Sequence, residues 1–193
     1  GDARIEGEIR LDAKSDLVSA DFPLVRLSAG DRIAVRVTRG ERGGLDLDVK
    51  GTRFDARDLI EARLKRGETG GGGKAIDGRI SLRIGSVDGY ADEELDGVNL
   101  DAVLVAGQLA DLAFTAQTAG GGATSATVMS AGGRRKLTVE ASEMGRLLRF
   151  LDYYGRVRGG RATFDAVIDA NGAISGRLDG QRWRIEGEPA LGR

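Results

Sequence analysis

Any chemistry in this chain would depend on carboxylates, hydroxyls and arginines, because its 193 residues include no histidine and no cysteine. Histidine is the usual general base near neutral pH and the commonest metal ligand. A Ser-His-Asp or Cys-His mechanism is therefore excluded within these residues, as are disulfides and thiolate metal sites. We predict a chain with no catalytic residue, no cofactor and no metal.

One glycine-rich stretch resembles a phosphate-binding loop. The stretch "GETGGGGK" covers residues 67–74, but Glu68 stands where the Walker pattern needs its first glycine. Ala75 follows Lys74 where the pattern needs Ser or Thr. We therefore interpret 67–74 as a flexible glycine loop.

Two acidic stretches resemble, in turn, a cation site and a catalytic pair of carboxylates. Residues 92–97, "DEELDG", space their acids like a calcium loop, but Val103 stands where the bidentate glutamate is required. Asp46 and Asp48 share one face of a predicted strand, and paired carboxylates can act as acid and base in a cleft. That face carries charges on the other predicted strands too, so cross-strand ion pairs are the favoured role.

Composition excludes some partners. The net charge is −1 and the isoelectric point is about 5.7, which argues against a nucleic-acid footprint. The longest apolar run, residues 102–107, is much shorter than the roughly 18 residues of a membrane span. The chain starts at Gly1 and carries no signal peptide, and we interpret residues 1–193 as a single segment of a larger protein.

Alternation of apolar and polar residues with period two is the dominant pattern and predicts strands. In residues 3–11 every odd position is apolar or glycine and every even position is charged. Asn171-Gly172 between two alternating runs predicts a hairpin. Similar turns are predicted at Asp88-Gly89, Gly132-Gly133 and Asp179-Gly180. Further alternating runs lie at 32–38, 45–50, 79–84, 136–140, 163–168 and 174–185, with less regular ones at 98–118 and 121–130.

Two short helices are expected, at 56–65 with Asp55 as N-cap and at 143–154 with Ser142 as N-cap. Each follows a similar stretch, "RFDARDL" at 53–59 and "TVEASEM" at 138–144, which indicates a repeated strand-to-helix unit. The second helix has an apolar stripe at i, i+3, i+4 and i+7 that predicts packing on the sheet. The stripe consists of Met144, Leu147, Leu148 and Leu151.

Ten or more strands with one apolar face cannot be covered by two short helices. The predicted fold is therefore mainly β, a large curled antiparallel sheet with two short amphipathic helices. Its apolar face either meets a second sheet as in a sandwich or forms an open groove. Trp183 is expected in the core. The candidate groove residues are Ile33, Val35, Leu45, Leu47, Val49, Ile80, Leu82 and Ile84.

The C-terminal part of the chain resembles the C-terminal region of AsmA-like envelope proteins of the YhdP type, in the TamB/AsmA superfamily. The resemblance extends over about 45–193 and is most specific in the last fifty residues. It rests on a Leu-Leu helix, an aromatic residue, an Arg-Gly-Gly, a hairpin and a closing Pro-Ala-Leu. Here these are Leu147, Leu148, Tyr154, Arg158, Gly159, Gly160, Pro189, Ala190 and Leu191.

This resemblance implies a non-enzymatic periplasmic segment of a Gram-negative bacterium, anchored in the inner membrane by a helix outside these residues. It also implies an apolar groove that carries phospholipid acyl chains toward the outer membrane and supports envelope integrity. On this reading Gly159-Gly160 let the chain turn back into the sheet. The alternative is a structural or protein-interaction β module for outer-membrane assembly, with a closed core.

Overall fold

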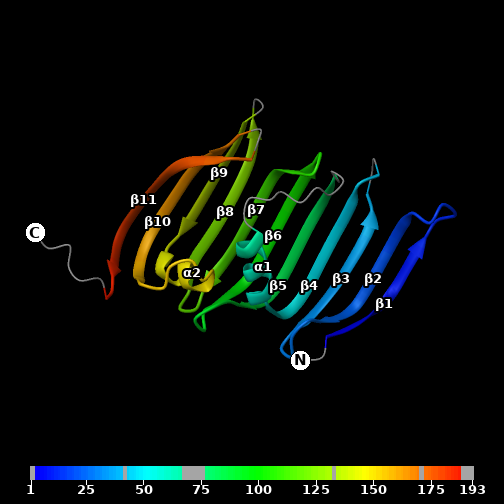
Figure 1. The fold of residues 1–193 in the computed structure, drawn as a ribbon, viewed down its shortest axis with the longest axis horizontal. Coiled ribbons are helices and arrows are strands. Elements are labelled where there is room, and N and C mark those ends of the chain that lie inside the picture. The colour runs from blue at the N-terminus through cyan, green and yellow to red at the C-terminus, as the bar shows by residue number, and fades with distance from the viewer. Residues whose placement is uncertain (1–2, 41–42, 67–76, 132–133, 170–171, 188–193) are drawn as a thin grey trace, which may run out of the picture.

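The computed structural model describes residues 3–40, 43–66, 77–131, 134–169 and 172–187, and its strands form one sheet in chain order (Figure 1). Strands take up 68% of the described residues and helices 9%, so the mainly β prediction is confirmed. The strands are β1 Arg4–Leu11, β2 Leu17–Arg26, β3 Arg32–Arg39, β4 Leu45–Asp55, β5 Gly78–Asp88, β6 Glu94–Val105, β7 Gln108–Thr118, β8 Gly122–Ala131, β9 Arg134–Ala141, β10 Val157–Ile168 and β11 Ile174–Ile185. The helices are α1 Arg57–Arg66 and α2 Met144–Phe150.

Nine of the ten neighbouring strand pairs are antiparallel, and β4 and β5 are parallel. A parallel pair needs a crossover connection, and α1 lies in the segment that supplies it. By contrast, α2 lies between two antiparallel strands, β9 and β10. The two strand-to-helix units are thus alike locally but lead into different connections.

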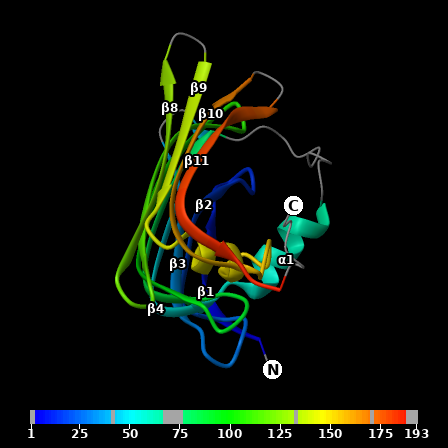
Figure 2. The same cartoon turned by 90° about the vertical axis from the view of Figure 1, so that its left-hand side faces the viewer.

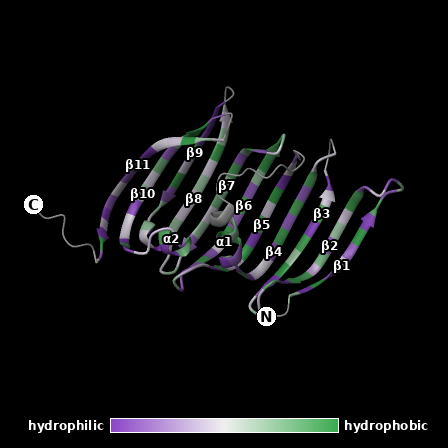
Figure 3. Cartoon of the chain, in the orientation of Figure 1, coloured by the Kyte–Doolittle hydropathy of each residue, from purple (hydrophilic) through white to green (hydrophobic). Residues whose placement is uncertain are grey.

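The sheet is curved and open, and both helices lie on its inner side (Figure 2). Ile60 of α1 and Phe150 of α2 pack into one apolar cluster with strand residues, including Ile33 and Ile84. These contacts define the inner face of the sheet. In Figure 3, hydrophobic and hydrophilic residues alternate along the strands, as the period-two pattern predicts.

Two rows of apolar residues cross the inner face at right angles to the strands, because residues paired across strands share a face. The first apolar row runs through Ile9, Ala20, Val37, Leu47, Ile80, Ala102, Leu112, Val128, Leu137 and Ala166, and ends on Gly176. The second apolar row runs through Phe22, Val35, Val49, Leu82, Leu100, Phe114, Ala126, Val139, Phe164 and Leu178.

Helix α2 ends earlier than predicted. Asp152 has a left-handed backbone, φ 54°, and its amide bonds to the carbonyl of Arg149 while the amide of Tyr153 bonds to that of Leu148. This is a Schellman closure in which an aspartate takes the place of the usual glycine. Leu151 therefore lies outside the helix and is exposed. The other three stripe residues, Met144, Leu147 and Leu148, pack against Ala141 and Ala162 as expected.

The helix starts follow the predictions in part. The carboxylate of Asp55 accepts a hydrogen bond from the backbone N–H of Arg57, the first residue of α1, at 3.1 Å. The hydroxyl of Ser142 instead donates to the carbonyl of Ala123 at 3.1 Å, and α2 has no side-chain cap. Ser142 thus ties α2 to β8 and does not cap the helix.

Strand β2 and the long strand β11 depart from the sequence predictions. The alternating pattern does not reveal β2, where Pro23 lies at an irregularity between Phe22 and Val25, the place where sheets tolerate proline. Asp179-Gly180 lies inside β11 and not in a turn. Trp183 is 43% exposed on this edge strand, so its prediction as a core residue is wrong.

The predicted glycine turns have different outcomes. Gly159 and Gly160 have φ of 62° and 89°, as a tight bend requires, but they bend β10 itself. The β10–β11 hairpin forms as predicted, with the Asp169 amide bonded to the carbonyl of Ala173 at 3.0 Å. Asn171, Gly132-Gly133, the 67–74 loop and Pro189-Ala190-Leu191 lie outside the described residues.

We predict that Phe150→Ala lowers the free energy of unfolding by about 3–5 kcal/mol, because it removes a buried ring and leaves a cavity. Phe150 is buried in the main apolar cluster and lies against Gly89. The matched control is Tyr153→Ala, where the side chain is 73% exposed and the change should stay within about 0.5 kcal/mol. Urea unfolding followed by circular dichroism measures both, and equal effects would show that α2 does not dock.

Candidate functional site

The candidate site is the inner face of the sheet. The structure places all eight candidate groove residues there. Leu47 and Ile80 belong to the first apolar row, and Val35, Val49 and Leu82 belong to the second. Ile33 and Ile84 lie closer to the helices. Leu45 lies beyond the first row, opposite Gly78.

Burial of these residues falls with distance from the helices. Ile33 and Ile84 lie beside the helix end of the sheet and are 7% and 3% exposed. Val49 and Leu82 in the second row are half-buried, as are Leu47 and Ile80 in the first. The helices therefore cover one end of the inner face, where the second row packs against the buried cluster, and the first row lies beyond it.

Sequence reasoning missed much of this surface. Leu100, Phe114, Val139 and Phe164 extend the second row across β6 to β10 and are half-buried. Their strands were recognised, but membership of one row depends on strand register. Register is set by pairing partners that are distant in sequence, so the alternation of one strand cannot reveal it.

A shallow pocket of about 540 Å³ lies along strands β5 to β8. Its lining combines four members of the first row with the eight residues that flank them along the strands, and those eight face the outer side. Ala102 is the small residue between two larger ones, Ile80 and Leu112. The first row is therefore uneven in side-chain size, but the pocket itself is lined mainly by outer-face residues and is not part of the candidate site.

The outer face of the sheet carries charge pairs. Arg36–Asp21 at 2.8 Å joins β3 to β2, and Arg83–Asp101 at 2.6 Å joins β5 to β6. The hydrogen bond from Arg83 lowers the pKa of Asp101 from its usual value. Such exposed pairs contribute little stability each, but they keep this face hydrated.

Asp46 and Asp48 belong to the same outer face. Asp48 lies 3.2 Å from Lys50 on its own strand, so its ion pair runs along β4 and not across strands as predicted. Asp46 is paired in register with Arg79 of β5. The two carboxylates face away from the apolar rows, and this placement gives no support to their role as an acid–base pair.

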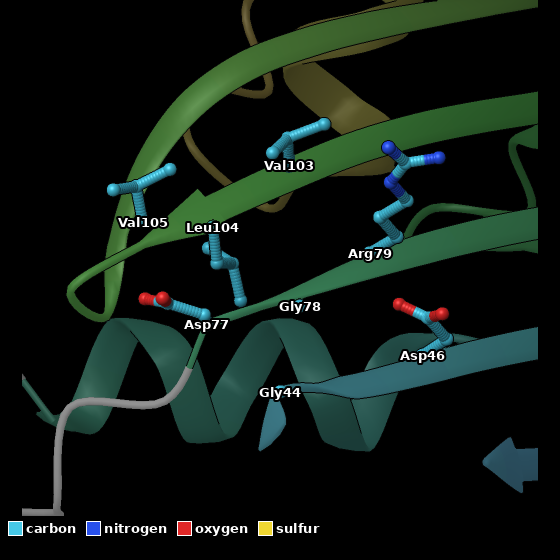
Figure 4. Close-up of a pocket in the computed structure, with 8 residues that line it drawn as sticks. All are labelled: Gly44, Asp46, Asp77, Gly78, Arg79, Val103, Leu104 and Val105. Atoms are coloured by element: carbon cyan, nitrogen blue, oxygen red, sulfur yellow. The ribbon is translucent and has the colours of Figure 1, made fainter. Parts of the chain in front are cut away.

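A second pocket, of about 480 Å³, lies at the ends of β4, β5 and β6 (Figure 4). Asp46, Arg79 and Asp77 line it together with the end of β6. The carboxylate of Asp77 accepts a hydrogen bond from the backbone N–H of Ala106 at 2.5 Å, so it holds the turn after β6. We assign this pocket no chemistry.

The candidate calcium stretch has a structural use. Glu93 is buried, and its carboxylate accepts hydrogen bonds from Arg146 at 2.9 Å and from Arg149 at 2.8 Å. Both arginines lie on α2, so the pair fastens this helix to the turn before β6. In the part of the chain that the structure describes, no three acidic side chains are grouped as a metal site requires.

Asp31 is a second buried carboxylate that the sequence did not reveal. It is fully buried and accepts hydrogen bonds from the amides of Leu27, Ser28 and Asp55 at 2.9, 2.7 and 2.8 Å. It therefore ties the turn between β2 and β3 to the end of β4, where α1 begins. Its partner Asp55 is 24 residues away, and nothing in the local pattern indicates that contact.

No protein-family model matches this chain, and no curated protein or solved structure was found to be similar to it. The geometry of the inner face is therefore the main basis for a function.

We predict that Glu93→Ala destabilises the chain by about 3–5 kcal/mol, because it leaves the largely buried Arg149 without its counter-charge. The control is Glu186→Ala, which removes an exposed Glu–Arg pair with Arg158 and should cost about 0–1 kcal/mol. Chemical unfolding of both variants provides the comparison. If Glu93→Ala were as mild as Glu186→Ala, the buried pair would not be what holds α2.

Proposed function

We propose that this chain is a non-enzymatic lipid-binding segment that holds acyl chains along the inner face of its sheet. The observation that carries the proposal is the pair of apolar rows that cross the sheet, in which large members such as Leu47, Ile80 and Leu112 stay half-buried. The described strands all belong to one sheet, so none of them forms a second layer over these rows. An apolar surface of this extent in water calls for an apolar occupant.

The size of the surface suits hydrocarbon. Neighbouring strands lie about 4.8 Å apart, so a row across ten strands extends over ~45 Å. An acyl chain reaches about half the ~30 Å hydrocarbon core of a bilayer. Each methylene that leaves water contributes about 0.8 kcal/mol. Because each row is apolar along most of its length, an acyl chain could be bound at several positions and move between them.

The envelope setting belongs to the same proposal. The resemblance to AsmA-like proteins supports a periplasmic location, an inner-membrane anchor outside these residues and phospholipid as the cargo. Among the described residues, no helix is both long enough and apolar enough to cross a membrane. The structural-module alternative would need a partner that keeps the two rows permanently dry.

We predict that Val35→Asp weakens binding of a fluorescent phosphatidylethanolamine about tenfold or more, because a carboxylate against acyl chains costs several kcal/mol to desolvate. Val35 lies in the second apolar row. The matched control is Ala34→Asp, which places the same charge on the outer face opposite Lys50 and should bind like the unaltered chain.

Circular dichroism and thermal melts confirm that both variants keep the fold. Lipids that co-purify with each variant are then measured by mass spectrometry. A folded Val35→Asp that binds and retains lipid like Ala34→Asp would overturn the proposed function.

A further inference from the structure

The two edges of the sheet are exposed and apolar on the inner side. Every residue of β1 is exposed, and in β11 all are exposed except Gly180. Ile5, Ile9 and Leu178 are 58%, 60% and 49% exposed. An exposed edge of this length is a template for strand pairing unless it is blocked.

The strand directions allow the two edges to pair between copies. Nine antiparallel pairs and one parallel pair separate β1 from β11, so these strands run in opposite directions. If a second copy continues the sheet with its inner face on the same side, its β1 lies antiparallel to β11 of the first. Antiparallel pairing is also the commoner arrangement in the rest of the sheet.

The backbone hydrogen-bonding groups also match. The amide of Asp12 bonds to the carbonyl of Asp16 beyond the end of β1, and that of Asp169 bonds to the carbonyl of Ala173 before β11. Along an antiparallel strand, residues direct their N–H and C=O alternately to one neighbour and to the other. The residues that direct these groups to the free edges are therefore the inner ones, Ile5, Gly7, Ile9 and Leu11 on β1 and Ile174, Gly176, Leu178 and Gly180 on β11.

In one register, side-chain sizes are complementary on the inner face. The first apolar row ends on Ile9 at one edge and on Gly176 at the other. Pairing these two places Gly7 opposite Leu178 and Ile5 opposite Gly180, so each glycine faces a large apolar residue. A shift by two residues either way sets Gly7 opposite another glycine and breaks the rows.

The same register is compatible with the outer-face charges. It places Glu8 directly opposite Arg177, an opposite-charge pair. Asp179 falls opposite Glu6, but each of these carboxylates already has an arginine on its own strand, Arg177 at 3.0 Å and Arg4.

We propose that β11 of one copy pairs with β1 of a second copy in this register, with Ile9 opposite Gly176. The interface is head-to-tail, so it can repeat and build an open array. Both apolar rows would continue from one copy into the next. The pairing does not depend on lipid binding, because its evidence is the match between the two edges.

The test uses disulfide trapping, which is clean because the chain has no cysteine. Glu8→Cys and Arg177→Cys are made in separate full chains, mixed and oxidised. In the proposed register, positions 8 and 177 form a non-hydrogen-bonded pair with Cα atoms about 4.5 Å apart, within disulfide range. We expect a heterodimer that forms about tenfold more than with either shifted partner, Glu6→Cys or Arg10→Cys, because those positions are offset by two residues.

Adding Ile9→Lys to Glu8→Cys should abolish the heterodimer, because a charge at an inner edge position opposes strand pairing. Circular dichroism checks that this variant keeps its fold. The proposal is overturned if the heterodimer forms no better than with the shifted partners. It is also overturned if a cross-link forms only in a chain that carries both Glu8→Cys and Arg177→Cys, since that disulfide would join the two edges of the same copy. Lipid binding is measured separately, so failure here leaves the proposed function standing.

Discussion

The structure depends on one constraint, that most apolar side chains of the eleven strands face the same way. Cross-strand pairing aligns them into rows, and each row must be shielded from water along its whole length. Helices make up only 9% of the described residues, and they shield one end of the inner face. Many of the larger row members beyond that end stay half-buried, and the proposed binding function rests on this imbalance between apolar area and cover.

Buried carboxylates make the helix end of the sheet rigid. Asp31 joins the β2–β3 turn to the end of β4, and Glu93 holds α2 through two arginines. A buried charge is stable only when it is paired or fully hydrogen-bonded, so each of these contacts fixes its surroundings. The second row borders this anchored end and the first row lies beyond it, so a ligand on the first row would not need the helices to rearrange.

The sequence predicted those features that depend on local pattern. Alternation identified most strands, and the stripe of Met144, Leu147 and Leu148 identified the docking of α2. The sequence pattern did not predict features that depend on distant partners or on unusual local chemistry. These are the parallel β4–β5 pair, the left-handed aspartate that ends α2, and strand β2 with Pro23. The candidate groove residues were found because they alternate cleanly, whereas Leu100 and Phe114 joined the surface only through register.

The central claim is that the first and second apolar rows contact acyl chains. Photo-crosslinking tests it most directly, with benzoylphenylalanine in place of Leu47 or Asp48, adjacent residues on opposite faces of β4. Each chain is irradiated with phosphatidylethanolamine vesicles, and lipid adducts are measured by mass spectrometry. We predict adducts at position 47 that are about tenfold more abundant than at position 48, because only the inner face meets hydrocarbon. Equal labelling at the two positions, or labelling only at 48, would contradict it.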